Sequence, residues 1–103
     1  MSSFHQRFLK EQLSDPDFRE AYNQARREID QIDAIMHRLE ELRIEAGVSK
    51  AELARRIGRN SASVRRWLTA QGSPELRNVV AMLDALGAKL QVVDAGSKHE
   101  AAA

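Results

Sequence analysis

Apolar residues recur at alternating intervals of four and three positions through the first half of the chain. This spacing puts them on one stripe of a helix and is typical of a helix that packs lengthwise on another. Because no breaker lies between Pro16 and Gly47, the pattern predicts one helix of roughly 30 residues, about 45 Å long. We call this stripe the seam; its members are Phe18, Tyr22, Ala25, Ile29, Ile32, Met36 and Leu39.

The seam is too long for a small domain to cover, which leaves two interpretations. In the first, the seam packs only within its own domain, with the N-terminal stretch 4–13 folded back over it. In the second, which we favour, it contacts a second copy or a different protein, because an exposed apolar stripe of this length needs a cover. The candidate partner or dimer residues are then Phe18, Tyr22, Ala25, Ile29, Ile32 and Met36.

Shorter helical patterns follow, and each ends at a glycine, the residue that most easily takes a left-handed conformation. Ser49 and Asn60 are predicted N-caps, because their short polar side chains can accept the unpaired N–H groups of a first helical turn. Asp15-Pro16 and Ser73-Pro74 predict two further helix starts. The last helix carries an apolar face formed by Leu76, Val79, Val80, Leu83 and Leu86.

After Gly87 the pattern changes to a period of two residues. Leu90 and Val92 then share one side of the chain, which predicts a short strand over 88–94. A single strand leaves its backbone groups unpaired, so we expect it to pair with a second copy or with another protein. Leu90 and Val92 are therefore further candidate interface residues.

Composition excludes several classes of function. The absence of cysteine removes disulfides and thiolate metal sites, and no apolar run suits a signal peptide or a membrane span, so we expect a cytoplasmic protein with no membrane partner. The three histidines share no metal-ligand spacing, and no glycine-rich loop follows a strand. We therefore expect no enzyme activity, no catalytic or metal-binding residues and no cofactor.

The net charge of +1 is distributed unevenly. Residues 1–46 carry seven Lys and Arg against ten Asp and Glu, and residues 74–103 carry three against four. Residues 47–73 carry six against Glu52 alone. A cationic segment between two slightly acidic ones favours a local anionic partner.

The cationic segment has the steric features of two helices that cross. Leu53, Ala54 and Ile57 fall on the inner face of its first helix, and Ala54 is small enough for a steep crossing. Gly58 permits a tight turn before the second helix. These are the requirements of a DNA-binding helix-turn-helix.

The segment resembles the helix-turn-helix of the Xre/phage-repressor type, in which a polar N-cap, Glu-Leu-Ala, an apolar residue and Gly precede a serine-rich recognition helix. The residues at the positions of this pattern are Ser49, Lys50, Glu52, Leu53, Ala54, Ile57, Gly58, Ser61, Ala62, Ser63, Val64 and Trp67.

The stretches "DPDFREAYNQARREID" and "LDALGAKLQVV" further resemble HigA-type antitoxins of bacterial toxin–antitoxin pairs. This second resemblance implies that the N-terminal region binds a RelE/HigB-like ribonuclease. It also implies that the helix-turn-helix represses the shared operon as a dimer.

Together these patterns predict an all-α fold, a helix-turn-helix bundle similar to lambda repressor, with a long N-terminal helix and a short C-terminal strand. Residues 1–31 form the helical partner-binding or dimerisation region. The remaining regions are the DNA-binding domain over 32–87, the strand over 88–94 and a flexible tail over 95–103.

The second helix of the motif is expected to enter the major groove with its N-terminal end first, at Asn60. Ser61, Ala62 and Ser63 are small enough to approach base edges. Arg65 and Arg66 lie on its outward face, where one arginine can bind guanine O6 and N7 and the other can bind a base or a phosphate.

Lys50, Arg59 and Thr69 are phosphate candidates, and Arg55 and Arg56 are weaker ones. Two of these residues depart from the Xre pattern. Lys50 stands in place of the usual glutamine, and Arg59 replaces a small apolar residue. Arg59 either extends towards the DNA backbone or leaves the turn less well packed.

The function implied is that of a sequence-specific repressor that binds a palindromic operator in double-stranded DNA as a homodimer and neutralises a small ribonuclease toxin. Two alternatives stay open. One is a stand-alone Xre-type regulator without a toxin, and the other is a protein-interaction module with a degenerate helix-turn-helix.

Overall fold

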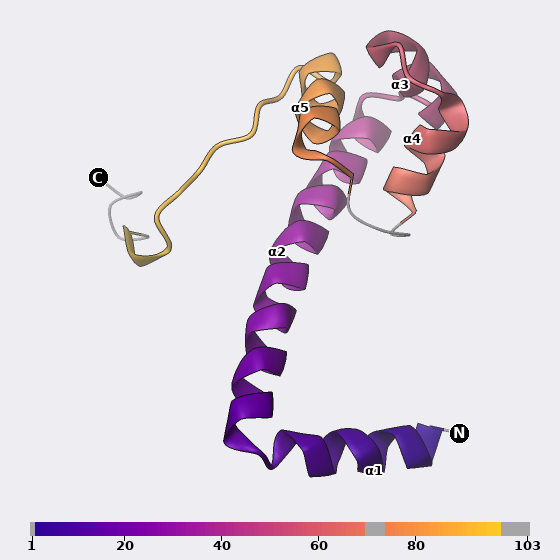
Figure 1. Ribbon diagram of the computed structural model, residues 1–103. Coiled ribbons are helices and arrows are strands. Elements are labelled where there is room, and N and C mark those ends of the chain that lie inside the picture. The colour runs from indigo at the N-terminus through magenta and orange to yellow at the C-terminus, as the bar shows by residue number, and fades with distance from the viewer. Residues whose placement is uncertain (1, 70–73, 98–103) are drawn as a thin grey trace. The chain divides into compact units, whose positions relative to one another are not determined.

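The computed structural model of the chain describes residues 2–69 and 74–97. Helices make up most of these ranges, and no strand occurs in them, which confirms the all-α class (Figure 1). The elements are α1 (Ser2–Leu13), α2 (Pro16–Glu45), α3 (Lys50–Ile57), α4 (Ser61–Leu68), α5 (Leu76–Ala85) and the short 3-10 helix η1 (Ala95–Ser97).

The chain divides into two compact units, unit 1 over Met1–Arg38 and unit 2 over Leu39–Ala103. The boundary falls inside α2, which the seam correctly predicted to be a single long helix.

Unit 1 contains α1 and most of α2, and the two helices are separated by Ser14 and Asp15. The Ser14 hydroxyl donates to the Glu11 carbonyl oxygen (2.6 Å), and an Asp15 carboxylate oxygen accepts from the Asp17 N–H (3.0 Å). The second bond caps the start of α2 as the Asp15-Pro16 pair predicts.

None of the described side chains of unit 1 is buried. Local pairs along α2 support the helix instead, such as the ion pair between Arg26 and Asp30 (3.3 Å), four residues apart. Each pair of this kind contributes about 0.2–0.5 kcal/mol. Unit 1 therefore has little tertiary packing of its own.

The seam changes in environment along α2. The rings of Phe18 and Tyr22 lie 6.3 Å apart between centroids and are half-buried, whereas Ile29 and Ile32 are 46% and 38% exposed. The described part of α1 does not cover these isoleucines, so the seam offers apolar surface to solvent. At Leu39 the same stripe enters unit 2 and is fully buried.

Unit 2 holds the hydrophobic core, in which α3 packs against both α4 and α5. Ala54 is 2% exposed, in agreement with the small residue expected where helices cross. Each large core side chain contributes roughly 1.5–3 kcal/mol through burial. The buried residues are Leu39, Val48, Leu53, Ala54, Val64, Leu68, Val79, Met82 and Leu83.

The strand predicted over 88–94 is not present in the single chain, in which these residues have no regular secondary structure. A strand exists only when a neighbouring strand accepts and donates its hydrogen bonds, and no described segment of this chain offers one. Leu90 is half-buried and Val92 is fully exposed.

The end of the chain differs from the prediction in two more details. The last helix begins at Leu76 rather than at Pro74, because Glu75 is extended (φ −65°, ψ 149°) and its carbonyl accepts the first helical bonds. Ser73 lies outside the described residues, as does the predicted tail from residue 98 on. The beginning of that tail forms η1.

Candidate nucleic-acid interface

Helix α3 begins and ends at the predicted residues. The Ser49 hydroxyl accepts a hydrogen bond of 3.0 Å from the Glu52 N–H, with Ser49 in an extended conformation. Gly58 ends the helix in the left-handed region (φ 67°, ψ 34°), which costs a glycine less than any other residue. Three residues, Gly58 to Asn60, then separate α3 from α4.

Helix α4 is capped by Asn60, whose side-chain oxygen accepts from the N–H groups of Ala62 (2.8 Å) and Ser63 (3.3 Å). Only this oxygen takes part in the cap, so the amide nitrogen of Asn60 stays available to a ligand. The cap confirms the predicted helix start and fixes the first turn of α4, the part expected to meet base edges.

Burial separates the two faces of α4, and Arg65 and Arg66 lie on the exposed face as predicted. Val64 and Leu68 are buried in the core of unit 2, and Trp67 is half-buried beside them. The side chains of Ala62, Arg65 and Arg66 are exposed, and Ser61 and Ser63 are half-buried. The helix therefore has an apolar rear and an exposed face that carries two cations.

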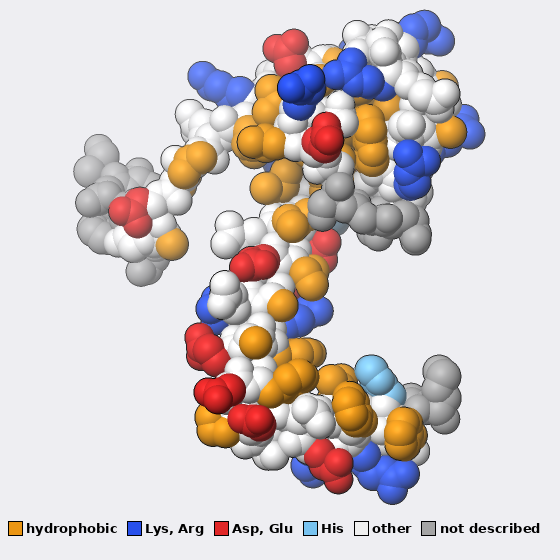
Figure 2. Space-filling model, in the orientation of Figure 1, with side chains coloured by type: hydrophobic (Ala, Val, Ile, Leu, Met, Phe, Trp, Pro, Cys, Tyr) orange, Lys and Arg blue, Asp and Glu red, His pale blue; other side chains and the backbone are white. Residues whose placement is uncertain are grey.

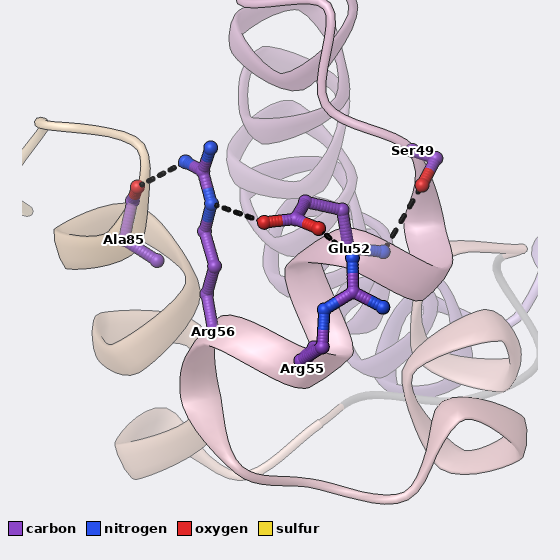
Figure 3. Close-up of polar contacts among 5 residues, drawn as sticks. All are labelled: Ser49, Glu52, Arg55, Arg56 and Ala85. Carbon is purple, nitrogen blue, oxygen red and sulfur yellow. Dashed lines mark hydrogen bonds and ion pairs between the residues drawn. The ribbon is translucent and has the colours of Figure 1, made fainter.

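Two of the three cations of α3, Arg55 and Arg56, are engaged within the chain. The Glu52 carboxylate receives Arg55 Nη2 on one oxygen and Arg56 Nε (3.1 Å) on the other (Figure 3). Arg56 Nη1 also donates to the carbonyl oxygen of Ala85, at the end of α5 (3.2 Å). Two of the six positive charges of segment 47–73 thus share the only negative charge in it.

Arg59 is tied to α5. Its Nε donates to Asn78 Oδ1 (3.1 Å) and its Nη1 to the Ile57 carbonyl oxygen (3.0 Å). Sequence reasoning did not find Asn78, which lies on a helix that its apolar pattern marks as a core helix. A contact over 19 residues has no local signal in the sequence.

The other predicted cations are less constrained. Lys50 and Arg65 make no hydrogen bond or ion pair to any described residue, and Arg66 Nη2 reaches only Ser63 Oγ at 3.4 Å. Thr69 ends α4 with its hydroxyl donating to the Arg66 carbonyl oxygen (3.1 Å). Arg65 and Arg66, together with Lys50 at the start of α3, are the cations best placed to pair with an external anion.

Figure 2 shows the resulting surface. In this view Lys and Arg side chains project around the body formed by α3, α4 and α5, and side chains of both charges lie along α1 and α2. This agrees with the charge distribution along the sequence and associates the anion-binding potential with unit 2.

Among residues 2–69 and 74–97, no three His, Asp or Glu side chains lie close enough together to hold a metal ion. No helix in these ranges combines the length and apolar character needed to cross a membrane.

Comparison with known proteins agrees with this geometry. A family model described as a helix-turn-helix domain matches residues 35–95, which is more than half of the chain and includes α3, α4 and α5. Searches of curated proteins and of solved structures return no match. The chain therefore belongs to the helix-turn-helix domain family, and a domain of this family indicates a DNA-binding regulator.

Proposed function

We propose that the chain is a sequence-specific transcriptional repressor that reads double-stranded DNA with α4. The observation that carries this proposal is the division of α4 into a buried rear, formed by Val64 and Leu68, and an exposed face with Arg65 and Arg66. Ser61, Ala62 and Ser63 leave the first turn narrow enough to enter a major groove.

Base and phosphate contacts divide between these side chains. One arginine of the pair Arg65 and Arg66 binds guanine O6 and N7, a contact worth about 1–3 kcal/mol of discrimination between bases. The amide nitrogen of Asn60, which the cap leaves available, is a further donor towards a base or a phosphate. Lys50 and Thr69 bind phosphates at the start of α3 and the end of α4.

DNA binding at a palindrome requires two copies. We propose that residues 88–94 supply the contact by pairing with the same segment of a second copy about a two-fold axis. Centring the axis on Gln91 sets Leu90 opposite Val92 of the second copy. The four apolar side chains then share one face of an antiparallel ribbon.

The exposure of Val92 supports this dimer, since its side chain is 100% exposed in the single chain and its backbone N–H and C=O groups can pair with a second strand. Two recognition helices related by the axis read half-sites about 34 Å apart.

The test is the affinity for DNA from the region upstream of the gene, measured by fluorescence anisotropy at several salt concentrations. Wild type is compared with Arg65→Ala, Arg66→Ala and a control, Arg27→Ala, which removes the same charge from unit 1. We expect log K to fall linearly with log salt, and each α4 variant to bind at least about tenfold more weakly than the control. Binding that does not depend on salt, or equal binding by all variants, would contradict the proposal.

We propose in addition that unit 1 binds and neutralises a small ribonuclease toxin, as the resemblance to HigA-type antitoxins implies. The exposed seam residues Ile29 and Ile32 support this role, because they offer apolar surface outside the DNA-binding unit. The acidic balance of residues 1–46 suits a basic partner.

Co-expression with the product of the adjacent gene tests the toxin. A stable complex and loss of ribonuclease activity are expected. If the adjacent gene encodes no such toxin, the protein acts as a stand-alone regulator. If it binds a protein partner but no DNA, it is an interaction module.

A further inference from the structure

Two arginines of the helix-turn-helix reach the opposite ends of α5. Arg59, in the middle of the turn between α3 and α4, donates from Nε to Asn78 Oδ1 at 3.1 Å. Asn78 is the third residue of α5. Arg56, near the end of α3, donates to the carbonyl oxygen of Ala85, the last residue of α5, at 3.2 Å.

The hydrogen bond from Arg56 to the Ala85 carbonyl is stabilised by its surroundings. The Ala85 carbonyl belongs to the last turn of α5, where a positive charge is favoured by the helix dipole. The Glu52 carboxylate pairs with Arg56 Nε at 3.1 Å, and this contact orients the guanidinium towards the Ala85 carbonyl oxygen (Figure 3). This contact fixes α3 against α5 but does not reach the turn.

The bond from Arg59 acts on the turn itself. Arg59 Nη1 also donates to the Ile57 carbonyl oxygen at 3.0 Å, so its guanidinium joins the end of α3 to Asn78. The next residue, Asn60, caps α4 through the N–H groups of Ala62 and Ser63. A displacement of the turn therefore moves the first turn of α4, which is the part proposed to meet base edges.

We propose that Asn78 is a positioning residue for DNA recognition and that it acts through Arg59. In this arrangement Arg59 holds the entrance of α4 in place instead of neutralising a phosphate. The inference rests on the proposed DNA-binding function and adds to it a residue of α5, outside the helix-turn-helix itself.

The two roles of Arg59 give different results in a double-mutant cycle. The variants are Asn78→Leu, Arg59→Ala and the two combined, with operator affinity measured over a range of salt concentrations. A positioning pair predicts that each single change weakens binding by about tenfold, the equivalent of one hydrogen bond to a charged group. The double variant then binds no more weakly than either single variant.

Salt dependence separates positioning from charge. With a positioning role, the slope of log K against log salt stays unchanged in both single variants. A lost phosphate contact changes this slope by about 0.9 for each contact. Asn78→Asp is the matched control, because it keeps the acceptor for Arg59; we expect it to bind more tightly than Asn78→Leu.

Several results would overturn the inference. One is a reduced slope in Arg59→Ala together with wild-type affinity in Asn78→Leu, since this identifies Arg59 as a phosphate ligand. Another is additive losses in the double variant, which show that the two side chains act separately. A melting temperature of Asn78→Leu more than about 10 °C below that of wild type, with a parallel loss in Asn78→Asp, indicates a general loss of fold and equally rejects the positioning role.

Hydrogen exchange tests the same pair without DNA. The amides of Ala62 and Ser63 should exchange faster in Asn78→Leu and in Arg59→Ala, whereas those of Leu83 and Ala85 stay protected as in wild type. If wild type binds no DNA, the proposed function is wrong. Hydrogen exchange alone then tests whether Asn78, through Arg59, holds the first turn of α4 in place. Unchanged exchange at Ala62 and Ser63 would overturn it.

Discussion

Arg43 joins the last turn of α2 to Val48 through a hydrogen bond of 2.7 Å from its Nη1 to the Val48 carbonyl oxygen. The Arg43 side chain is only 13% exposed, and its Nε also pairs with the Glu40 carboxylate. Val48 is buried and directly precedes Ser49, the cap of α3. A charged side chain of α2 thus fixes the point at which the chain enters the helix-turn-helix.

Replacing Arg43 with methionine should destabilise unit 2. The change keeps much of the apolar stem but leaves the Val48 carbonyl without this donor, which costs about 1–3 kcal/mol of unfolding free energy. Urea denaturation followed by circular dichroism measures the difference. Glu40→Gln is the control, because it removes the ion pair and leaves the bond to Val48; its loss should stay below about 1 kcal/mol. Equal losses in the two variants would show that the ion pair, and not the bond to Val48, is what matters.

Replacing Gly58 with alanine should lower the unfolding free energy by about 1–2 kcal/mol, because the φ of 67° at this position is unfavourable for a residue with a Cβ atom. A Cβ built at this position has no heavy atom outside the adjacent residues within 4 Å. The whole loss of unfolding free energy therefore comes from the backbone conformation. A variant that differs in its tolerance of a positive φ can separate this cause from steric crowding.

Gly58→Asn provides that distinction, since asparagine tolerates the left-handed region better than alanine does. We expect wild type to have the highest melting temperature, Gly58→Asn an intermediate one and Gly58→Ala the lowest. Steric crowding as the cause would reverse the order of the two variants, because asparagine is larger.

The cap of α4 should matter for both stability and recognition. Asn60→Ala removes the acceptor for the Ala62 and Ser63 N–H groups, at a cost of about 1 kcal/mol in unfolding free energy. Asn60→Asp keeps the acceptor and should preserve stability. It also brings a negative charge to the proposed groove-facing end of α4, so operator affinity should fall although the domain is fully folded. The two measurements together are decisive: unchanged affinity in Asn60→Asp would place this end of α4 away from DNA.

Local chemistry explains why much of the fold was predictable. Ser49 and Asn60 cap helices through N–H groups two or three residues ahead, and Gly58 adopts a conformation that glycine alone takes readily, so each signal is contained in a short stretch. The spacing of Glu52 and Arg56 by four residues also permits an ion pair on one helix face, but this pair was not predicted.

Other features depend on information that a short stretch does not contain. The bond between Arg59 and Asn78 exists only because α5 packs against α3, which no spacing within either helix reveals. Residues 88–94 show the opposite case: an alternating pattern indicates which side chains can share a face, but not whether a second strand is present. In the single chain these residues consequently have no regular secondary structure.

The exposed seam allows a change that separates partner binding from folding. Ile29→Asp combined with Ile32→Asp places two charges on the seam within unit 1, where both side chains are exposed and no described side chain is buried. The unfolding free energy of unit 2 should therefore change by less than about 0.5 kcal/mol. Binding of the partner that covers the seam should be lost, because each charge must be desolvated in an apolar contact. The matched control is Gln31→Asp with Ala34→Asp, which adds the same charge off the seam on the same helix. Pull-down and light scattering of the two variants measure the outcome, and equal behaviour would show that the seam contacts neither a second copy nor another protein.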